Sequence, residues 1–383
     1  MKTIRELNLE NKKVLLRVDF NVPIKNNQIL DDARIISALD TINYLLEKNA
    51  KIIILSHLGR IKEEKDKEKN SLSIVSKRLG ELLNKEIIFI NNTRGKTLED
   101  KISTMKNKDI LLMENTRFED YPNKLESNND EKLGKYWASL GDVFINDAFA
   151  TLHRKHASNV GIASNIKEKG IGFLVEKELY HLEEVIENKN KLTLILGGSK
   201  VKDKLELINN LIADVEQILI GGGMANTFLK AKGIDIGKSI YEEDLIETCK
   251  DILNKYGNKI ILPIDYVLSD NISNKPINDN IRNLMILDIG EKTIELFKNN
   301  LKDKDLVFWN GPLGVYENKY YANGTNKILE FLVKNNIKTV LGGGDIVAAS
   351  KKYADKLYYV STGGGASLEF LAKSNLPGLE EMK

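Results

Sequence analysis

The sequence predicts an α/β protein with two domains, each built on a parallel β-sheet flanked by helices. Short apolar, β-branched runs alternate along the chain with amphipathic stretches of helical length, which is the pattern of parallel sheets. The chain also has 383 residues. A single hydrophobic core stops growing at roughly 250–300 residues. We therefore expect two cores and two sheets.

The apolar runs supply the expected strands in order. In the first half they are Val14–Val18, Ile52–Leu55, Ile87–Ile90, Ile110–Met113 and Val143–Ile145. In the second half they are Leu192–Leu196, Gln217–Ile220, Ile260–Ile264, Leu306–Trp309, Thr339–Leu341 and Leu357–Val360. Each half can thus build its own sheet.

A helical connector is expected between the halves, over Leu174–Asn190. Its apolar residues Leu174, Leu179, Leu182 and Ile186 fall on or near one helical face, and the other positions are mostly Glu and Lys.

Composition narrows the classes of function. Hydrophobic residues make up 42% and charged residues 29% of the chain, as in a globular protein. The 57 Lys and Arg nearly balance the 55 Asp and Glu, so no global basic field favours nucleic acid. The single cysteine, Cys249, cannot form an intramolecular disulfide. No run approaches the ~18 apolar residues of a membrane span, and Met1–Glu6 is charged at once, so we expect a cytoplasmic protein.

Basic and amide side chains follow the strands of the first half. In open parallel sheets, ligands bind beyond the carboxyl ends of the strands. The segments at these ends are Asp19–Asn21, Ser56–Arg60, Glu114–Arg117 and Asn146–Phe149, the last running on to His153–His156. With Arg17 and Arg34 they offer guanidinium groups suited to phosphate and carboxylate. Any one of these arginines could instead serve a surface salt bridge, but the set favours a small, strongly anionic ligand.

Glycines follow the strands of the second half. The turns are Gly197–Lys200, Gly221–Gly223, Asn310–Pro312, Gly342–Asp345 and Thr362–Gly365. Glycine lets backbone N–H groups approach phosphate oxygens at a helix N-terminus, so nucleotide phosphates are the expected ligand. One such turn would be weak support, because turns need glycine for backbone reasons alone.

Neither standard phosphate fingerprint fits these turns. Gly237-Lys238-Ser239 lacks the preceding P-loop glycine, since residue 232 is lysine. Gly221-x-Gly223 is followed by Asn226, where a dinucleotide-binding fold has its third glycine. The nucleotide site is therefore of another kind.

The same segments, in the same order, resemble the phosphoglycerate kinase family over essentially the whole chain. The matching stretches are Arg17–Pro23, Ser56–Arg60, Glu114–Phe118, Asn146–Phe149 with His153 and Arg154, Gly197–Val201, Gly221–Ala225, Trp309–Pro312, Gly342–Asp345 and Ser361–Gly365. The resemblance implies reversible Mg²⁺-dependent phosphoryl transfer between ATP and the carboxylate of 3-phosphoglycerate, giving ADP and 1,3-bisphosphoglycerate in glycolysis. It implies a phosphotransferase with a carboxyl acceptor, and a monomer without nucleic-acid or membrane partners.

The resemblance also assigns the site residues. It implies that 3-phosphoglycerate is held by Arg17, Asp19, Asn21, Arg34, His57, Arg60, Arg117 and Arg154. It implies that the nucleotide is held by Gly198, Lys200, Lys204, Gly222, Gly223, Asn310, Pro312, Glu317, Gly342, Gly343, Gly344, Asp345, Ile346, Gly364 and Gly365. Asp345 would ligate Mg²⁺, although it could also cap a helix.

The implied organisation is two Rossmann-like domains joined by a helical hinge. We expect a 3-phosphoglycerate domain over residues 1–170, a hinge over 171–190, a nucleotide domain over 191–365, and a segment over 366–383 that returns to the N-terminal domain. Arg34 and Lys200 are the expected catalytic residues, contacting the transferring phosphoryl group from the two domains after closure. The nucleophile is a carboxylate, already ionised at pH 7, so no general base is needed.

Several residues depart from the family pattern. Ile346 stands where a threonine usually follows Gly-Gly-Gly-Asp, and Asn226 stands where an apolar or aromatic residue is usual. Ile61 and Leu152 replace the usual proline and alanine. None of these changes removes a charged site residue, but weaker nucleotide binding is a possible result of the lost hydroxyl at Ile346.

Two rival functions are left open. A nicotinamide-dependent dehydrogenase also uses an α/β sheet with glycine turns, but its Gly-x-Gly-x-x-Gly fingerprint is missing. A nucleotide-binding α/β protein without kinase activity is the second rival. Binding of nucleotide without turnover of 3-phosphoglycerate would favour it.

Overall fold

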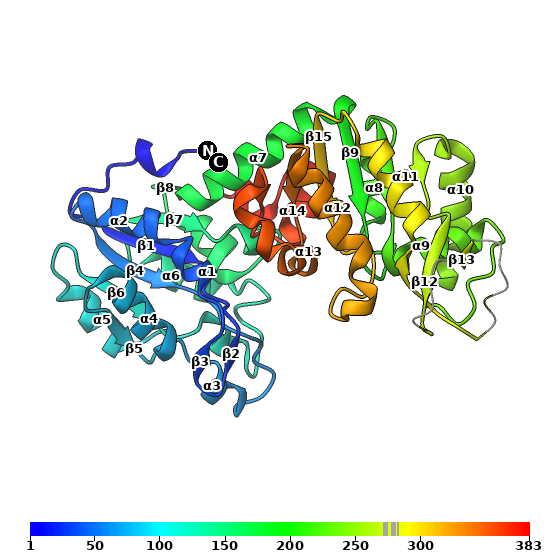
Figure 1. Ribbon diagram of the computed structural model, residues 1–383. Helices are drawn as coiled ribbons and strands as arrows, with labels where there is room; N and C mark the ends of the chain where they lie inside the picture. Colours follow the sequence, from blue (N-terminus) through cyan, green and yellow to red (C-terminus); the bar gives the residue numbers. More distant parts are fainter. Residues whose placement is uncertain (271–274, 277–280, 282) are drawn as a thin grey trace. The chain divides into compact units, whose positions relative to one another are not determined.

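The computed structural model describes residues 1–270, 275–276, 281 and 283–383 (Figure 1). The chain divides into two compact units. The first unit comprises Met1–Tyr180 together with Asn375–Lys383, and the second comprises His181–Ser374.

A six-stranded parallel sheet forms the centre of the first unit, with the strand order β5-β6-β4-β1-β7-β8. The strands are β1 (Lys13–Val18), β4 (Lys51–Leu55), β5 (Ile88–Ile90), β6 (Ile110–Met113), β7 (Val143–Asp147) and β8 (Lys169–Ile171). The five predicted runs all form strands, which confirms a parallel sheet in this half. The sixth strand, β8, escaped prediction because it consists only of Lys169, Gly170 and Ile171.

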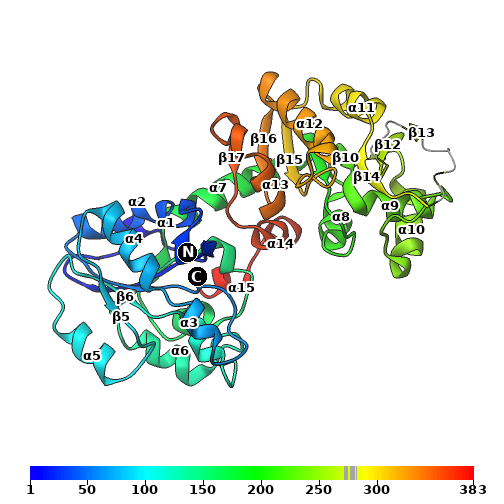
Figure 2. The same ribbon diagram turned by 60° about the horizontal axis from the view of Figure 1, so that its bottom comes forward.

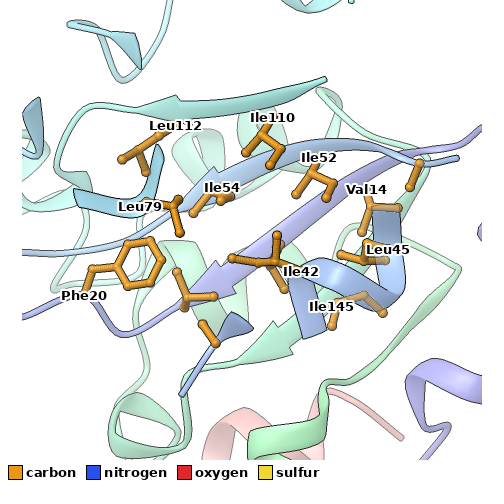
Figure 3. Packing of buried hydrophobic residues seen from close by; sticks show 14 of the residues in the cluster. Val14, Phe20, Ile42, Leu45, Ile52, Ile54, Leu79, Ile110, Leu112 and Ile145 are labelled. Atoms are coloured by element: carbon orange, nitrogen blue, oxygen red, sulfur yellow. The ribbon is translucent and has the colours of Figure 1, made fainter. Parts of the chain in front are cut away.

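Both faces of this sheet are buried, which explains why its central strands are mostly apolar. Along β1, Val14, Leu16 and Val18 belong to one core cluster and Leu15 to the other. Figure 3 shows the first cluster, where Val14 and its neighbours pack against Ile42 and other side chains of the covering helices. The helices of this unit are α1 (Ala33–Ile36), α2 (Leu39–Glu47), α3 (Asp66–Lys69), α4 (Ser73–Leu83), α5 (Lys96–Ser103) and α6 (Glu131–Ala138). Cluster residues from α1, α2 and α4 cover one face, and those from α5 and α6 cover the other.

A second six-stranded parallel sheet forms the centre of the second unit, with the order β11-β10-β9-β15-β16-β17. Its strands are β9 (Leu192–Leu196), β10 (Gln217–Ile220), β11 (Ile260–Ile261), β15 (Leu306–Asn310), β16 (Lys338–Leu341) and β17 (Tyr359–Val360). The predicted strand over Ile260–Ile264 ends early, before Pro263, whose missing N–H cannot join a ladder. The helices are α8 (Leu205–Leu211), α9 (Gly222–Ala231), α10 (Ile246–Tyr256), α11 (Glu291–Leu301), α12 (Asn323–Lys334), α13 (Gly344–Ala349) and α14 (Gly365–Lys373).

Two small antiparallel sheets were not predicted. A hairpin in the first unit pairs β2 (Ile24–Lys25) with β3 (Gln28–Ile29). A three-stranded sheet in the second unit has the order β13-β12-β14, formed by Lys275–Pro276, Asp265–Leu268 and Ile286–Ile289. β2, β3 and β13 have two residues each, and the four-residue strands β12 and β14 each contain an aspartate, so none stands out as an apolar run.

The expected connector forms as α7 (Phe173–Glu187), and the boundary between the units falls inside it. Its fully buried apolar residues are Val175, Leu179, Leu182 and Val185. Leu174 and Ile186, which we expected on this face, are half-buried, because the buried stripe runs one residue away from each.

The end of the chain returns to the first unit as α15 (Pro377–Glu380), which Figure 2 shows near the N-terminus. The backbone N–H of Gly378 donates to the carbonyl of Leu152 at 2.8 Å. Met382 is buried in the core cluster that also contains Leu133 and Trp137.

The strand order places a switch point in each sheet. In the first sheet, β4 is added on one side of β1 and β7 is added later on the other side, so the order of strands reverses at β1. The second sheet repeats this at β9, which lies between β10 and β15. Ligands of open α/β sheets bind at such points, beyond the carboxyl ends of the strands. Among the described residues, no helix combines the length and apolar character needed to cross a membrane.

Candidate active site

The loops after β1, β4 and β6 are bonded to one another at the edge of the first sheet. The side-chain oxygen of Asn21 accepts from the Gly59 N–H at 2.9 Å, and that of Asn115 accepts from the Leu58 N–H at 3.1 Å. The Phe20 N–H donates to Ser56 at 2.8 Å. These amide and hydroxyl groups satisfy loop backbone that would otherwise be buried unpaired. The charged side chains therefore extend from fixed loops.

Asp19, directly after β1, supplies a carboxylate among these basic groups. It forms an ion pair with Arg34 of α1, whose side chain is 38% exposed. One of its oxygens lies 3.9 Å from Nδ1 of His57, at the end of β4. The structure thus brings together three predicted residues that are up to 38 positions apart in the sequence, with Arg34 partly open to solvent.

Arg117 and Arg154 complete a cluster of basic groups. Arg117 follows β6 in a 3₁₀ helix (Thr116–Asp120), is almost fully buried, and donates to the carbonyl of Gly59. Burial, followed by the positive charge of Arg154, lowers its pKa. Arg154 is exposed and donates to Nε2 of His153 at 3.0 Å. We call Arg34, His57, Arg117, Arg154 and His156 the basic cluster.

His156 was missed as a site residue, although it stands in the His153–His156 run that the sequence displays. It is 7% exposed, and Nδ1 lies 3.8 Å from the carboxylate of Glu126. Burial, followed by the charges of Arg17 and Arg117, lowers its pKa to about 3. Its imidazole is therefore neutral at pH 7.

Arg17 lies beneath the cluster rather than on its surface. Its side chain is fully buried, and its three guanidinium nitrogens contact Ser158, the carbonyl of Val18, and His57. Arg60, by contrast, is exposed after Gly59. Two arginines given the same role by the sequence thus occupy very different environments.

The glycine turns of the second unit pack backbone against backbone. A Cβ at Gly222 would lie 2.8 Å from the N and O atoms of Gly198 and from the carbonyl oxygen of Pro312. A Cβ at Gly197 would lie 2.1 Å from that same oxygen. The turns after β9, β10 and β15 therefore meet only because these residues have no side chains.

A pocket of about 300 Å³ lies against these turns. Six predicted residues contribute to its lining, together with side chains such as Leu313, Val315 and Tyr316 that sequence reasoning missed. The predicted residues are Gly198, Gly222, Gly223, Pro312, Glu317 and Asp345, with Asn226 as the noted departure. Ligand pockets are mostly apolar with a few polar groups, and this one has that character.

A second hollow of about 430 Å³ collects six more predicted residues: Lys204, Asn310, Gly343, Gly344, Gly364 and Gly365. Lys204 is 7% exposed, and burial lowers its pKa, against the opposing charges of Asp203, Asp345 and Glu242. A buried lysine beside glycine turns is suited to a phosphate oxygen.

Three predicted nucleotide residues lie outside both hollows. Lys200 is exposed after β9 and lines neither. A Cβ at Gly342 would lie 2.9 Å from the ring of Phe308, so this glycine serves packing. The side chain of Ile346 is fully buried in the core of the second unit. Only its backbone can face a ligand at the start of α13.

The residues present suit a magnesium ion carried by a nucleotide. Asp345 is exposed at the first turn of α13 and lines the same pocket as Glu317. No cluster of three or more His, Cys, Asp or Glu side chains occurs in the described part of the chain. Mg²⁺ is usually held by one or two carboxylates plus substrate phosphates, rather than by a protein cage, so a single carboxylate here is sufficient.

Comparison with known proteins gives one family across the chain. The model of the family described as phosphoglycerate kinase matches residues 4–374. This chain belongs to the phosphoglycerate kinase family. Curated relatives of that name occur in Fusobacterium nucleatum, 52% identical with 99% of this chain and 98% of the relative covered, and in Enterococcus faecalis, 51% identical with the same coverage.

Solved structures of the family have the same fold. The phosphoglycerate kinase of Coxiella burnetii superposes with a TM-score of 0.87 at 37% identity, covering 100% of this chain and 98% of that one. The enzyme of Pyrococcus horikoshii gives a TM-score of 0.86 at 32% identity with the same coverage. The predicted family and the two-sheet α/β architecture are confirmed.

Asn226 differs from the usual family residue in a way that the structure makes specific. Its side chain is fully buried in α9, and Nδ2 donates to the carbonyl of Ile240 at 3.0 Å. Its Oδ1 has no hydrogen-bond partner among the described residues. The amide thus bonds α9 to a loop that lines the pocket, a contact that an apolar or aromatic side chain cannot make.

Proposed function

We propose that this chain catalyses phosphoryl transfer between a nucleoside triphosphate and the carboxylate of 3-phosphoglycerate, as the family does. It is a phosphotransferase with a carboxyl group as acceptor. The observation that carries this function is the pairing of two unlike sites within one family-matched chain. The basic cluster lies beyond the carboxyl ends of the strands of the first sheet. The glycine turns and the pocket beside them lie beyond the carboxyl ends of the strands of the second sheet.

The basic cluster is our proposed site for 3-phosphoglycerate. Its cations repel one another and are partly desolvated, and both effects disfavour the positive charges. The negative charges of a ligand with a phosphate and a carboxylate would offset both effects. We propose that Asp19, Asn21, Arg34, His57, Arg60, Arg117 and Arg154 hold this substrate. Asp19 supports the proposal by orienting Arg34 through an ion pair that leaves part of the guanidinium accessible.

The second unit is our proposed site for ATP and ADP. The pocket of about 300 Å³ suits the nucleoside, with Glu317 as the acidic group for ribose hydroxyls. The glycine turns and Lys204 suit the phosphates. The remaining proposed contacts are Gly198, Lys200, Gly222, Gly223, Asn310, Pro312, Gly342, Gly343, Gly344, Asp345, Ile346, Gly364 and Gly365.

The proposed chemistry is direct in-line transfer. The carboxylate of the acceptor attacks the γ-phosphorus, and the bond from phosphorus to the bridging oxygen of ADP breaks. Mg²⁺ held with the nucleotide would supply positive charge to the phosphate oxygens, and Asp345 is the residue placed to bind it. Arg34 and Lys200 would stabilise charge on the equatorial oxygens, each from its own unit, so transfer requires closure of the two units.

We further propose a monomer in the cytoplasm. A single cysteine, which cannot form an intramolecular disulfide, supports a reducing compartment. Cys249 is buried, and burial raises its pKa to about 12. A thiol with that pKa is not a nucleophile at pH 7.

A coupled assay with 3-phosphoglycerate, ATP and Mg²⁺ tests the function, beside a reaction with the metal chelated. We expect ADP release that requires both 3-phosphoglycerate and Mg²⁺. Asp345→Asn should raise the Mg²⁺ concentration needed for half-maximal rate, because it loses one anionic ligand. Nucleotide binding without release of ADP would reject the kinase and favour a nucleotide-binding protein without kinase activity.

A further inference from the structure

Arg17 and His57 form a buried contact that fixes the state of the imidazole. Nη2 of Arg17 lies 3.2 Å from Nδ1 of His57, and both residues are at most 5% exposed. A guanidinium can only donate hydrogen bonds, so Nδ1 must be the acceptor. A histidine that accepts at Nδ1 is neutral and carries its proton on Nε2.

The groups around His57 favour the same state. The nearby charges are Arg17 on β1, Asp19 after β1, Arg34 on α1 and Arg117 after β6, and the neutral imidazole of His156 also lies close. The carboxylate of Asp19 lies 3.9 Å from Nδ1, beyond hydrogen-bond distance. Burial, followed by the charges of Arg17 and Arg117, lowers the pKa of His57 well below its ordinary value. An imidazolium would meet several cations in a desolvated site.

The guanidinium of Arg17 is itself held in position through Ser158 by a buried carboxylate, that of Glu126. Nε of Arg17 donates to the hydroxyl of Ser158 at 3.0 Å, and that hydroxyl donates to Glu126. The Ser158 N–H also donates to Glu126, at 2.8 Å. Glu126 is fully buried, and its charge favours the charged form of Arg17. The order Glu126, Ser158, Arg17, His57 thus links four separate segments of the first unit.

We propose that Arg17 is a positioning residue that acts through His57, rather than a ligand of the acceptor. It keeps His57 neutral, with Nε2–H as a hydrogen-bond donor toward the anion, at every pH between 5 and 8. The role of that donor rests on the proposed function. The predicted consequence is that His57 contributes a fixed donor instead of a titrating positive charge.

Nuclear magnetic resonance of the imidazole nitrogens tests the protonation state directly in the whole wild-type protein. The chain has only four histidines, so the ¹⁵N spectrum is simple, and a His57→Gln spectrum identifies the His57 signals by their absence. We expect the neutral pattern with the proton on Nε2, unchanged from pH 8 to pH 5. An imidazolium pattern within that range, or a proton on Nδ1, would overturn the proposal.

A charge-neutral pair of substitutions tests the cause. Removing Arg17 alone would leave the buried charge of Glu126 without its guanidinium partner and destabilise the fold, so both charges are removed together as Arg17→Met with Glu126→Gln. We expect the pKa of His57 to rise toward 6.5, and its Nδ1/Nε2 preference to weaken. KM for 3-phosphoglycerate should then acquire a dependence on pH, falling as His57 gains charge. An unchanged His57 spectrum in this double variant would contradict the proposal.

Arg78→Gln is the matched control, since Arg78 is an arginine of α4 that pairs with Asp32 and Glu81 outside the cluster. It should change neither the His57 spectrum nor the pH profile of KM. The two readouts also separate the proposals. A neutral His57 in a protein without turnover would reject the proposed function alone. A charged His57 in an active enzyme would reject the role of Arg17 alone.

Discussion

Arg117 and Arg154 repel each other at the end of the first sheet, and this repulsion adds to burial in lowering the pKa of Arg117. His156 pays a similar penalty, because its imidazole is buried next to Arg17 and Arg117. Such crowding costs folding free energy in the empty protein. This crowding of basic groups is expected at a site that binds an anion, because the ligand supplies the compensating negative charge. Substrate binding and stability are therefore opposed at these residues.

Arg154→Ala should separate the two effects. Loss of a charge-assisted hydrogen bond of about 1.5–3 kcal/mol would raise KM for 3-phosphoglycerate by about tenfold to a hundredfold. The free energy of unfolding should not fall and should rise by no more than about 0.5 kcal/mol, because Arg154 is exposed and its repulsion of Arg117 is removed. Steady-state kinetics and urea unfolding measure both. Lys155→Ala, which removes the adjacent exposed charge, should leave KM near wild type, and an equal rise in both variants would argue against a specific contact.

His156 predicts a particular dependence of stability on pH. Its pKa is about 3 in the folded protein and near 6.5 when unfolded, so the unfolded chain takes up the proton first. Its contribution to stability is complete above pH 6.5 and is lost progressively as the pH falls toward 3. Between pH 7 and pH 5, wild type should lose up to about 2 kcal/mol more than His156→Gln, measured by urea unfolding. Parallel pH curves for the two proteins would show that the imidazole is not held neutral.

At the level of elements, the turn after β10 requires glycine for two reasons: its backbone conformation and its close contact with neighbouring backbone. Gly222 has φ of +62°, which residues with a side chain rarely adopt. Its Cα also faces the Gly198 and Pro312 backbones, which leave no space for a Cβ. The conformation and the close approach are separate requirements, and they can be tested separately.

Gly222→Ala and Gly233→Ala form a matched pair. Both glycines have positive φ, +62° and +75°, but a Cβ at Gly233 would meet nothing within 4 Å. Gly233→Ala should therefore cost only the backbone penalty of about 1–2 kcal/mol and leave ADP affinity unchanged. Gly222→Ala should cost more and weaken ADP binding at least tenfold, since the turns after β9 and β15 must move apart. Calorimetric ADP titration and urea unfolding check this, and equal losses in the two variants would disprove the role of the close contact.

The sequence predicts the strands well where burial on both faces makes them mostly apolar, as in β1, β6, β9 and β10. It fails where pairing rather than composition makes the strand, as in β8, whose only apolar side chain is Ile171. Site residues follow the same division. Strand ends locate His57 and Arg117. The position of Arg17 inside an apolar run is consistent with its burial, and Arg60 follows a glycine in an exposed loop, but no local signal shows what holds Arg17 in the interior. Its position there depends on Glu126 and Ser158, whose bonding to Arg17 is set by tertiary contacts.

For the whole molecule, the first unit is complete only with the end of the chain. Asn375–Lys383 belongs to it, and a Cβ at Gly378 would lie 2.7 Å from Oδ1 of Asn159. Asn159 follows Ser158, the residue that bonds Arg17. The C-terminal segment therefore packs against the residue next to Ser158, although the second unit separates the two in sequence.

Because each unit is proposed to bind one of the two ligands, we can predict how each ligand changes the thermal stability of the protein. A ligand at a hundred times its Kd stabilises the folded state that binds it by about 2.7 kcal/mol. 3-Phosphoglycerate and ADP should each raise the thermal unfolding temperature of wild type. Arg60→Ala should shift the response to 3-phosphoglycerate to about tenfold to a hundredfold higher concentrations and leave the ADP response in place, while Lys200→Ala should do the reverse. Both side chains are exposed, so the unliganded proteins should unfold near the wild-type temperature. If either substitution weakened both responses equally, the assignment of one ligand to each unit would be wrong.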